Sequence, residues 1–207
     1  MNFLLLQIRR IIISSSIFIT LLAYLFILFT ISDNDLQVTE LAKIFALLSI
    51  FYLYLALLPS PLYDLFPKFP LRGLFLKGRR AIGFSAWFFA EIHSCLIFFG
   101  KLKGFSGLLF LNNYYLLAIG VGAISLFILT ILAFTSFDFM IAMLTFKKWK
   151  FLHRFVYLAS ILIIIHVLMI GEHFSNLSNP ISQLSIFAAI ILLFLEAIRL
   201  NKYLNTK

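Results

Sequence analysis

Six long apolar runs constrain this chain more than any other feature of its sequence. They cover residues 11–31, 40–58, 81–100, 114–135, 152–171 and 181–199. Each run is about 18–22 residues long, and about 20 residues of α-helix cross the hydrocarbon core of a bilayer. Because lipid offers no partners to backbone amides and carbonyls, such spans must be helical. The sequence therefore predicts an all-α, polytopic membrane helix bundle with six transmembrane helices.

The composition excludes other classes of protein. Hydrophobic residues make up 63% of the chain and charged residues only 12%, with a mean hydropathy of +1.07. A soluble domain is about 45–50% apolar and about 25% charged, and a disordered chain is less apolar still. Six spans and short loops leave no room for a soluble catalytic domain in 207 residues. We therefore expect residues 1–207 to form a single six-span membrane domain.

The positions of the basic residues predict the orientation of the spans. Of the 17 Lys and Arg residues, 14 fall at the N-terminus, in the second and fourth loops or at the C-terminus. The remaining three are Lys43, Lys101 and Lys103. Basic residues concentrate on the cytoplasmic side, so both termini are expected in the cytoplasm. Membrane topology and contact with anionic lipid then account for the net charge of +9, and no nucleic-acid partner is implied.

Two histidines are predicted to lie at similar depth in the membrane. Counted from the cytoplasmic ends of their spans, His93 lies about 18 Å deep and His166 about 21 Å deep. Ionisable residues at membrane depth are costly and usually functional. Two helices that each present a histidine at one depth can ligate haem iron from both sides. The sequence predicts His93 and His166 as iron ligands, with hydrogen-bonded packing between helices as the alternative.

A third histidine, His153, is expected near the cytoplasmic face. It precedes His166 by about 20 Å of helix, so the two cannot share one iron. It is a candidate to ligate a second haem with another partner, to bond a haem propionate or to approach a flavin. Nearby basic side chains are candidates for haem propionates or a flavin phosphate, with topological charge as the alternative. These are Arg79, Arg80, Lys150 and Arg154.

Three other ionisable residues receive weaker predictions. His173 is expected at the outer interface, because it follows His166 by about 10 Å of helix. Glu91 and Glu196 fall within predicted spans. Glu91 is expected to be protonated or hydrogen-bonded to a neighbouring helix, and a proton-handling role is the alternative.

Four stretches together resemble a known family. They are Arg79-Arg80-Ala81-Ile82-Gly83 with His93 following, Ala133–Asp138, Trp149-Lys150-Phe151-Leu152-His153-Arg154-Phe155-Val156-Tyr157-Leu158, and His166. The chain resembles the haem-binding membrane subunits of bacterial protein-methionine-sulfoxide reductase systems, the MsrQ or YedZ family, within the ferric-reductase-like transmembrane group. The likeness covers residues 40–171 well, which we take as the ferric-reductase-like core.

The resemblance implies a function and a set of cofactors. It implies haem b held at His93, His166 and His153, an association with FMN, and a location in the bacterial inner membrane. Electrons would pass from quinol or a cytosolic flavin reductase to a periplasmic molybdopterin reductase. The chain would then be an electron-transfer subunit of an oxidoreductase system. The alternatives are a stand-alone ferric-reductase-like protein and a haem-free transporter or assembly factor.

Overall fold

The computed structural model describes residues 3–171 and 178–205, and this part of the chain forms helices and no strand. The prediction of an all-α bundle is therefore confirmed. The elements are α1 (Phe3–Thr30), α2 (Asn34–Leu57), α3 (Pro59–Leu65), α4 (Arg72–Cys95), the π-helix η1 (Leu96–Lys101), α5 (Phe105–Leu108), α6 (Asn113–Phe134), α7 (Asp138–Leu152), α8 (Phe155–Ile170) and α10 (Pro180–Asn205).

The helices are long and apolar enough to form a polytopic membrane protein. Five candidate spans are Gln7–Thr30, Asn34–Leu65, Arg72–Lys101, Asn113–Phe134 and Pro180–Asn205. Helices α7 and α8 meet at an angle of 47° and make a sixth if the bent pair is one span. The six predicted spans therefore correspond to helices of the structure, and the count of six depends on the α7–α8 pair.

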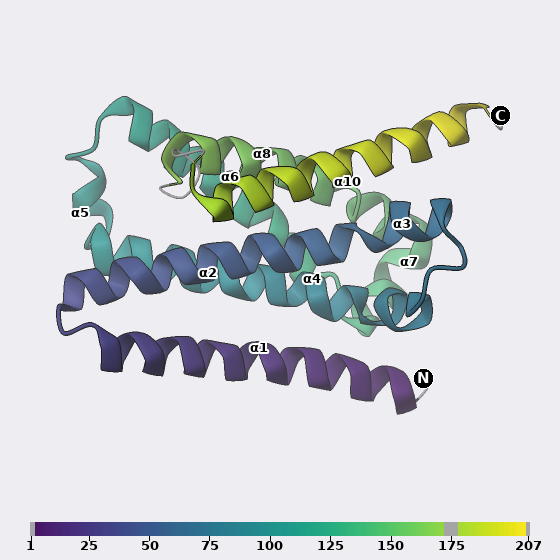
Figure 1. Ribbon diagram of the computed structural model, residues 1–207, viewed down its shortest axis with the longest axis horizontal. Coiled ribbons are helices and arrows are strands. Elements are labelled where there is room, and N and C mark those ends of the chain that lie inside the picture. Colours follow the sequence, from purple (N-terminus) through teal and green to yellow (C-terminus); the bar gives the residue numbers. More distant parts are fainter. Residues whose placement is uncertain (1–2, 172–177, 206–207) are drawn as a thin grey trace.

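The long helices pack as two main pairs. Helix α2 runs along α4, and α6 runs along α8. Contacts between these pairs are sparser and run mainly between α4 and α6, while α1 lies against α4 on the outside of the bundle (Figure 1). The described ends of α1 and α10 nearest the termini lie at the same end of the molecule, together with α3 and α7 (Figure 1). We refer to this as the α7 end.

Small and hydroxyl-bearing residues hold neighbouring helices together. Ser16 Oγ on α1 donates to Ser85 Oγ on α4 at 2.8 Å. Ser49 Oγ on α2 donates to the carbonyl oxygen of Ala86 at 3.0 Å. Ala86 is fully buried, as is Phe89 one turn along α4. Small residues and interhelical hydrogen bonds of this kind stabilise helix pairs in lipid, where hydrophobic burial alone gives little driving force.

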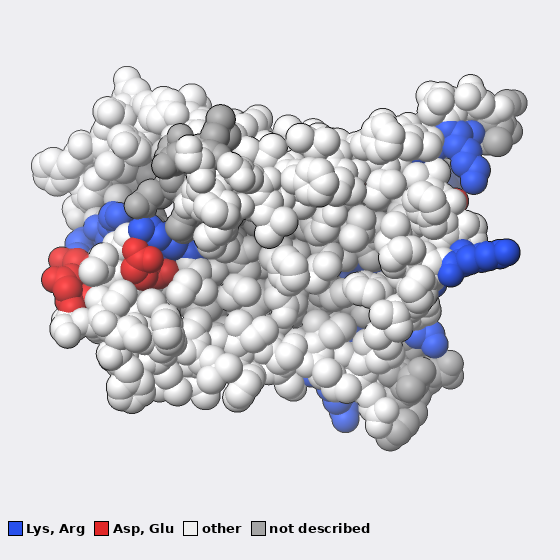
Figure 2. Space-filling view, viewed as in Figure 1, with Lys and Arg blue, Asp and Glu red and all other residues white. Residues whose placement is uncertain are grey.

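The charged residues gather at the two ends of the molecule. On the face that Figure 2 shows, Lys and Arg side chains lie toward both ends, Asp and Glu are visible mainly at the end opposite α7, and a broad band with almost no charge lies between. At the end opposite α7, side-chain caps begin two helices: Asp33 accepts from the amide of Leu36, and Asn112 accepts from the amide of Tyr115. Capped helix ends outside an uncharged band are typical of spans that leave the bilayer.

The main departures from the predicted elements are local. Helix α7, with 15 residues ending at Leu152, occupies the predicted loop between the fourth and fifth runs. The fifth predicted run, 152–171, corresponds to α8, which begins at Phe155 after a break at the α7–α8 bend. Helix α7 is itself kinked at Thr145, which has non-helical backbone angles (φ 63°, ψ 149°). Hydropathy alone does not locate the kink, because Leu144 and Phe146 on either side of Thr145 are apolar.

Candidate functional site

The imidazole of His93 on α4 is fixed by a backbone carbonyl of α2. Its Nδ1 lies 2.8 Å from the carbonyl oxygen of Ala42, which is buried. A carbonyl oxygen can only accept, so Nδ1 carries the proton and donates it. Nε2 is then the nitrogen with a lone pair, which is the form of imidazole that ligates a metal.

His166 on α8 repeats this arrangement against α6. Its Nδ1 lies 2.8 Å from the carbonyl oxygen of Ala118, which is fully buried. By the same reasoning Nδ1 donates, and Nε2 keeps its lone pair. Each of the two main helix pairs therefore holds one histidine in the same tautomer.

The structure brings His93 and His166 close enough across the bundle for a charge on one imidazole to be felt by the other. They belong to different helix pairs, and α4 and α8 make few direct contacts. Metal-ligating histidines almost always donate their other N–H to a carbonyl, carboxylate or water. Two imidazoles of this kind fit the role of ligands to a haem iron.

His153 lies elsewhere, at the α7–α8 bend. Its Nε2 is 3.2 Å from Thr135 Oγ1, and that hydroxyl donates to the carbonyl oxygen of Ile131 at 2.7 Å. Nε2 of His153 is therefore the donor to Thr135. The Trp149 ring lies against the imidazole, with centroids 4.3 Å apart and the planes tilted by 35°, and its indole N–H donates to the Thr135 carbonyl at 2.9 Å. Thr135 and Trp149 thus orient His153 from two sides.

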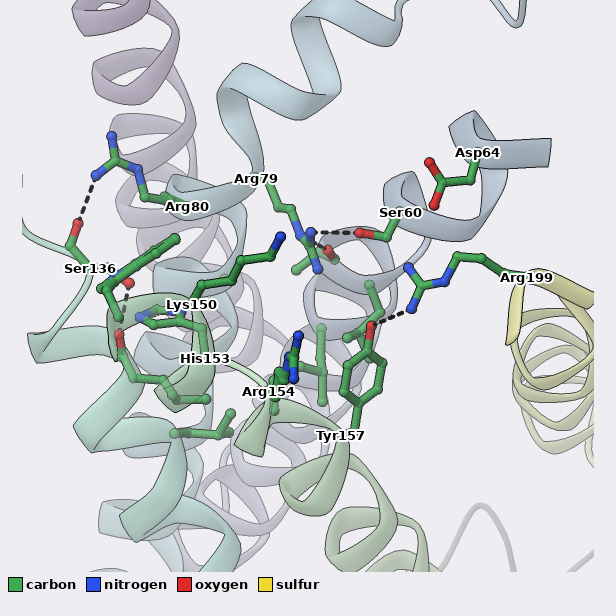
Figure 3. A pocket seen from close by; sticks show the side chains of 18 of the residues that line it. Ser60, Asp64, Arg79, Arg80, Ser136, Lys150, His153, Arg154, Tyr157 and Arg199 are labelled. Carbon is green, nitrogen blue, oxygen red and sulfur yellow. Dashed lines mark hydrogen bonds between the residues drawn. The ribbon is translucent and has the colours of Figure 1, made fainter. Parts of the chain in front are cut away.

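A basic cavity opens beside His153 at the α7 end (Figure 3). Its volume is about 950 Å³, and its apolar lining includes Leu53, Leu132 and Val156. Six basic residues and one acidic residue, Asp64, also line it, so the charge of its walls favours an anion. The basic residues are Arg79, Arg80, Lys150, Arg154, Arg199 and Lys202.

Arg79 and Arg80 differ in how they are held. Arg79 Nε donates to the carbonyl oxygen of Ala56 at 2.7 Å, and its NH1 donates to Ser60 Oγ at 2.7 Å (Figure 3). Arg80 NH1 lies 2.6 Å from Asp138 Oδ1 in an ion pair that connects α4 to α7. Both side chains are half-buried. Arg80 therefore has a structural partner as well as its place in the cavity wall.

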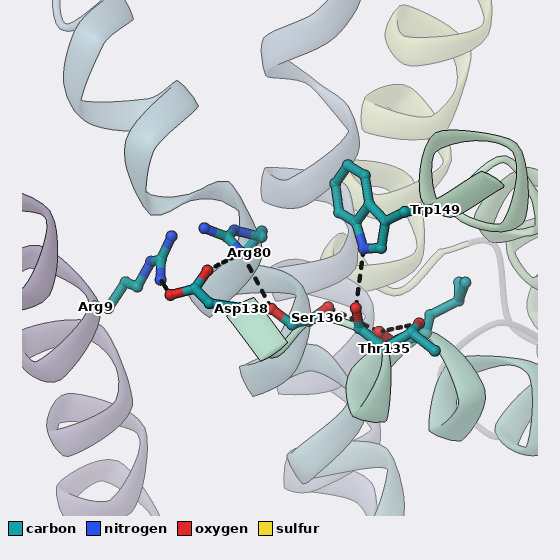
Figure 4. Close-up of polar contacts among 7 residues, drawn as sticks. Arg9, Arg80, Thr135, Ser136, Asp138 and Trp149 are labelled. Carbon is teal, nitrogen blue, oxygen red and sulfur yellow. Dashed lines mark hydrogen bonds and ion pairs between the residues drawn. The ribbon is translucent and has the colours of Figure 1, made fainter. Parts of the chain in front are cut away.

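The carboxylate of Asp138 connects three helices (Figure 4). Its Oδ2 lies 3.0 Å from Arg9 NH1 on α1, and its Oδ1 pairs with Arg80 on α4. Arg80 NH1 also donates to the carbonyl oxygen of Ser136 at 3.2 Å. Since Asp138 begins α7, this network fixes that helix against α1 and α4.

Helix α10 completes one wall of the basic cavity. The sequence did not predict that residues of this helix belong to the site. Tyr157 on α8 donates to Glu196 Oε1 at 3.1 Å and accepts from Arg199 NH2 at 3.2 Å. Arg199 also pairs with Glu196 Oε2 at 2.7 Å. The three-residue spacing of Glu196 and Arg199 on an apolar helix is the sequence signal that marks them.

Comparison with known proteins places the chain in a family. The family described as ferric reductase like transmembrane component matches residues 42–164. That match covers more than half of the chain.

The chain belongs to the ferric-reductase-like transmembrane family.

The part matched to the family contains His93 and His153, and it ends two residues before His166. The chain is also similar to the protein-methionine-sulfoxide reductase heme-binding subunit MsrQ of Rhodospirillum rubrum, with 35% identity over 126 residues. These residues are 60% of this chain and 57% of that relative, so the alignment spans little more than half of the relative's length. His173 lies outside the described residues.

Proposed function

We propose that this chain is a haem b electron carrier of the bacterial inner membrane, with His93 and His166 as the axial ligands. The observation that supports this most is their shared geometry: each Nδ1 donates to a carbonyl at 2.8 Å and leaves Nε2 for the metal. Membership of a ferric-reductase-like family and similarity to a heme-binding subunit point the same way.

The bound haem supplies one-electron chemistry, and the chain's own residues set its surroundings. His93 and His166 would hold the iron, one from each of the two main helix pairs. The carbonyls of Ala42 and Ala118 fix the rotation and the tautomer of the two imidazoles. The apolar helices exclude water, which lowers the local dielectric and contributes to the reduction potential.

The basic cavity beside His153 is proposed as the site of a second cofactor on the electron-input side, either FMN or a second haem. A cavity of about 950 Å³ with apolar and cationic walls suits a planar molecule that carries phosphate or carboxylate groups. Arg80 and Arg154 line the cavity and are the proposed partners of those anionic groups. His153 is the proposed contact to the ring system or the second iron.

The donor and the acceptor are proposed from the relative. MsrQ of Rhodospirillum rubrum is named as the heme-binding subunit of a protein-methionine-sulfoxide reductase. By analogy, electrons would enter from quinol or a cytosolic flavin reductase and leave to a periplasmic molybdopterin reductase. The family description also favours a second candidate, a stand-alone protein that reduces a ferric acceptor. Reduction of ferric chelates without a partner protein would distinguish the second candidate.

Absorption spectra of the purified protein, oxidised and then reduced with dithionite, test the proposal. The wild type should show a low-spin haem b, and His93→Ala and His166→Ala should each abolish that spectrum. Ile164→Ala, a change at an exposed position of α8, is the matched control and should leave the spectrum intact. Wild-type protein without haem, or low-spin haem retained in both histidine variants, would overturn the assignment.

A further inference from the structure

Gly122 on α6 lies directly against the imidazole of His166. A β-carbon placed on Gly122 would lie 2.6 Å from His166 Nδ1, 2.7 Å from its Cε1 and 3.2 Å from its Cγ. Ordinary contacts between such atoms are about 3.5–4.0 Å. The ring of His166 therefore occupies the space that any other residue at position 122 would need.

Helix geometry explains why the glycine falls at this position. In an α-helix the carbonyl of residue i accepts from the amide of residue i+4. Residue 122 is four residues after Ala118, so it stands beside the carbonyl that His166 also uses. A side chain there would stand between the imidazole and its acceptor.

The three nearest heavy atoms to a β-carbon at 122 all belong to the His166 ring, and none belongs to the backbone of a neighbouring helix. Gly120 lies two residues away on the same helix, and a β-carbon placed there would meet nothing within 4 Å. Glycine inside a helix costs about 1 kcal/mol relative to alanine. A glycine at 122 therefore has a specific steric reason, which is the approach of the His166 ring.

We propose that Gly122 is a positioning residue for the axial ligand His166. Lacking a side chain, it lets Nδ1 donate to the Ala118 carbonyl, which fixes the ring orientation and makes Nε2 a stronger donor to iron. This inference rests on the proposed ligation of haem by His166. It adds that His166 can bind iron strongly because Gly122 on the neighbouring helix has no β-carbon to displace the imidazole ring.

The test compares Gly122→Ala with Gly120→Ala in the full-length protein purified with haem. Loss of an outer hydrogen bond of this kind weakens metal-site affinity by about 10–100-fold. Gly122→Ala should therefore retain haem more weakly by that factor, shift the low-spin EPR signal and raise the midpoint potential. Gly120→Ala should match the wild type in all three measurements.

Both alanine variants are expected to fold, since alanine favours helix over glycine; size-exclusion chromatography and circular dichroism check this. The positioning role would be overturned if folded Gly122→Ala showed unchanged haem content, EPR signal and midpoint potential. The proposed ligation by His166 would still stand in that case. Loss of the low-spin haem in His166→Ala, measured in parallel, separates the two claims. If Gly120→Ala shifts the spectra as much as Gly122→Ala does, the effect belongs to α6 in general and the inference is wrong.

Discussion

At the scale of single residues, the orientation of His153 depends on one hydroxyl group. Thr135→Val removes the acceptor of the His153 Nε2–H bond but keeps the Thr135 backbone carbonyl that binds Trp149. Loss of one such bond is worth about 1 kcal/mol. If His153 serves electron input, reduction of the haem by its physiological donor should slow by about fivefold. Stopped-flow absorbance measures that rate, and reduction by dithionite should be unchanged.

A matched control for this change is Thr20→Val on α1. The Thr20 hydroxyl donates to the carbonyl of Ser16 in its own helix, as the Thr135 hydroxyl does to Ile131, so its removal has a similar local effect. His153→Ala should slow donor-driven reduction at least as much as Thr135→Val. Wild-type rates in both His153→Ala and Thr135→Val, with unchanged haem and flavin content, would remove His153 from electron input.

The sequence indicated the candidate histidines but not what holds them. Depth along an apolar run follows from residue number, and this singled out His93 and His166. Their hydrogen-bond acceptors are backbone carbonyls, which every residue has, so no residue type marks Ala42 or Ala118 as partners. The tautomer of each ring is therefore a property of the packed helices and becomes visible only in three dimensions.

At the scale of elements, the kink in α7 predicts a stabilising substitution. Thr145 has φ 63° and ψ 149°, a region that is costly for a β-branched residue and accessible to glycine. Thr145→Gly relieves about 1–3 kcal/mol of strain and should raise the free energy of unfolding by about 1 kcal/mol after its entropic cost. Unfolding in mixed detergent micelles measures the change.

Ala142→Gly, in the regular part of the same helix, is the opposing control. Its backbone is helical, so glycine there should lower stability by about 1 kcal/mol. The two substitutions to glycine are thus expected to differ in sign. A loss of stability in Thr145→Gly would show that the threonine is not strained at this position.

The link between α8 and α10 gives a second prediction for elements. Tyr157→Phe removes the hydroxyl that donates to Glu196 and accepts from Arg199. Interhelical hydrogen bonds in membrane proteins contribute about 0.6–2 kcal/mol, so unfolding in detergent should become easier by about 1 kcal/mol. Tyr24→Phe, at an exposed position of α1, is the control and should change little. Equal stability of both variants would mean that this contact does not hold α10 in place.

Element boundaries show how far hydropathy alone can reach. The predicted fourth run, 114–135, agrees with α6 within one residue at each end, because capping by Asn112 coincides with the edge of the run. The fifth run, 152–171, began three residues before α8, because a span-length average of hydropathy does not resolve the two-residue break at His153 and Arg154. The basic cavity was beyond prediction as a shape, because its walls come from helices that are far apart in the sequence.

At the scale of the whole molecule, the placement of charge and of histidines suggests a direction for electron flow. The basic cavity and His153 lie at the α7 end, whereas His93 and His166 lie further along the bundle. An electron delivered at the α7 end would pass His153 before it reaches the paired histidines, about 20 Å along the axis of the α7–α8 pair. Electrons would move from the cytoplasmic side to the outer side only if the α7 end faces the cytoplasm. The proposed direction of electron transfer therefore depends on the membrane topology, which can be measured.

The single cysteine makes that measurement direct. In a Cys95→Ala background, new cysteines at Ser32 and Ser106 report the end opposite α7, and cysteines at Lys68 and Lys148 report the α7 end. Because 14 of 17 basic residues fall on the side predicted to be cytoplasmic, a membrane-impermeant maleimide should label positions 32 and 106 in intact cells. Positions 68 and 148 should react only after the membrane is permeabilised. The reverse pattern would place the basic cavity outside and rule out a cytosolic donor at His153. Labelling of both position 32 and position 148 in intact cells would mean that an even number of spans, and not the three predicted, separates them.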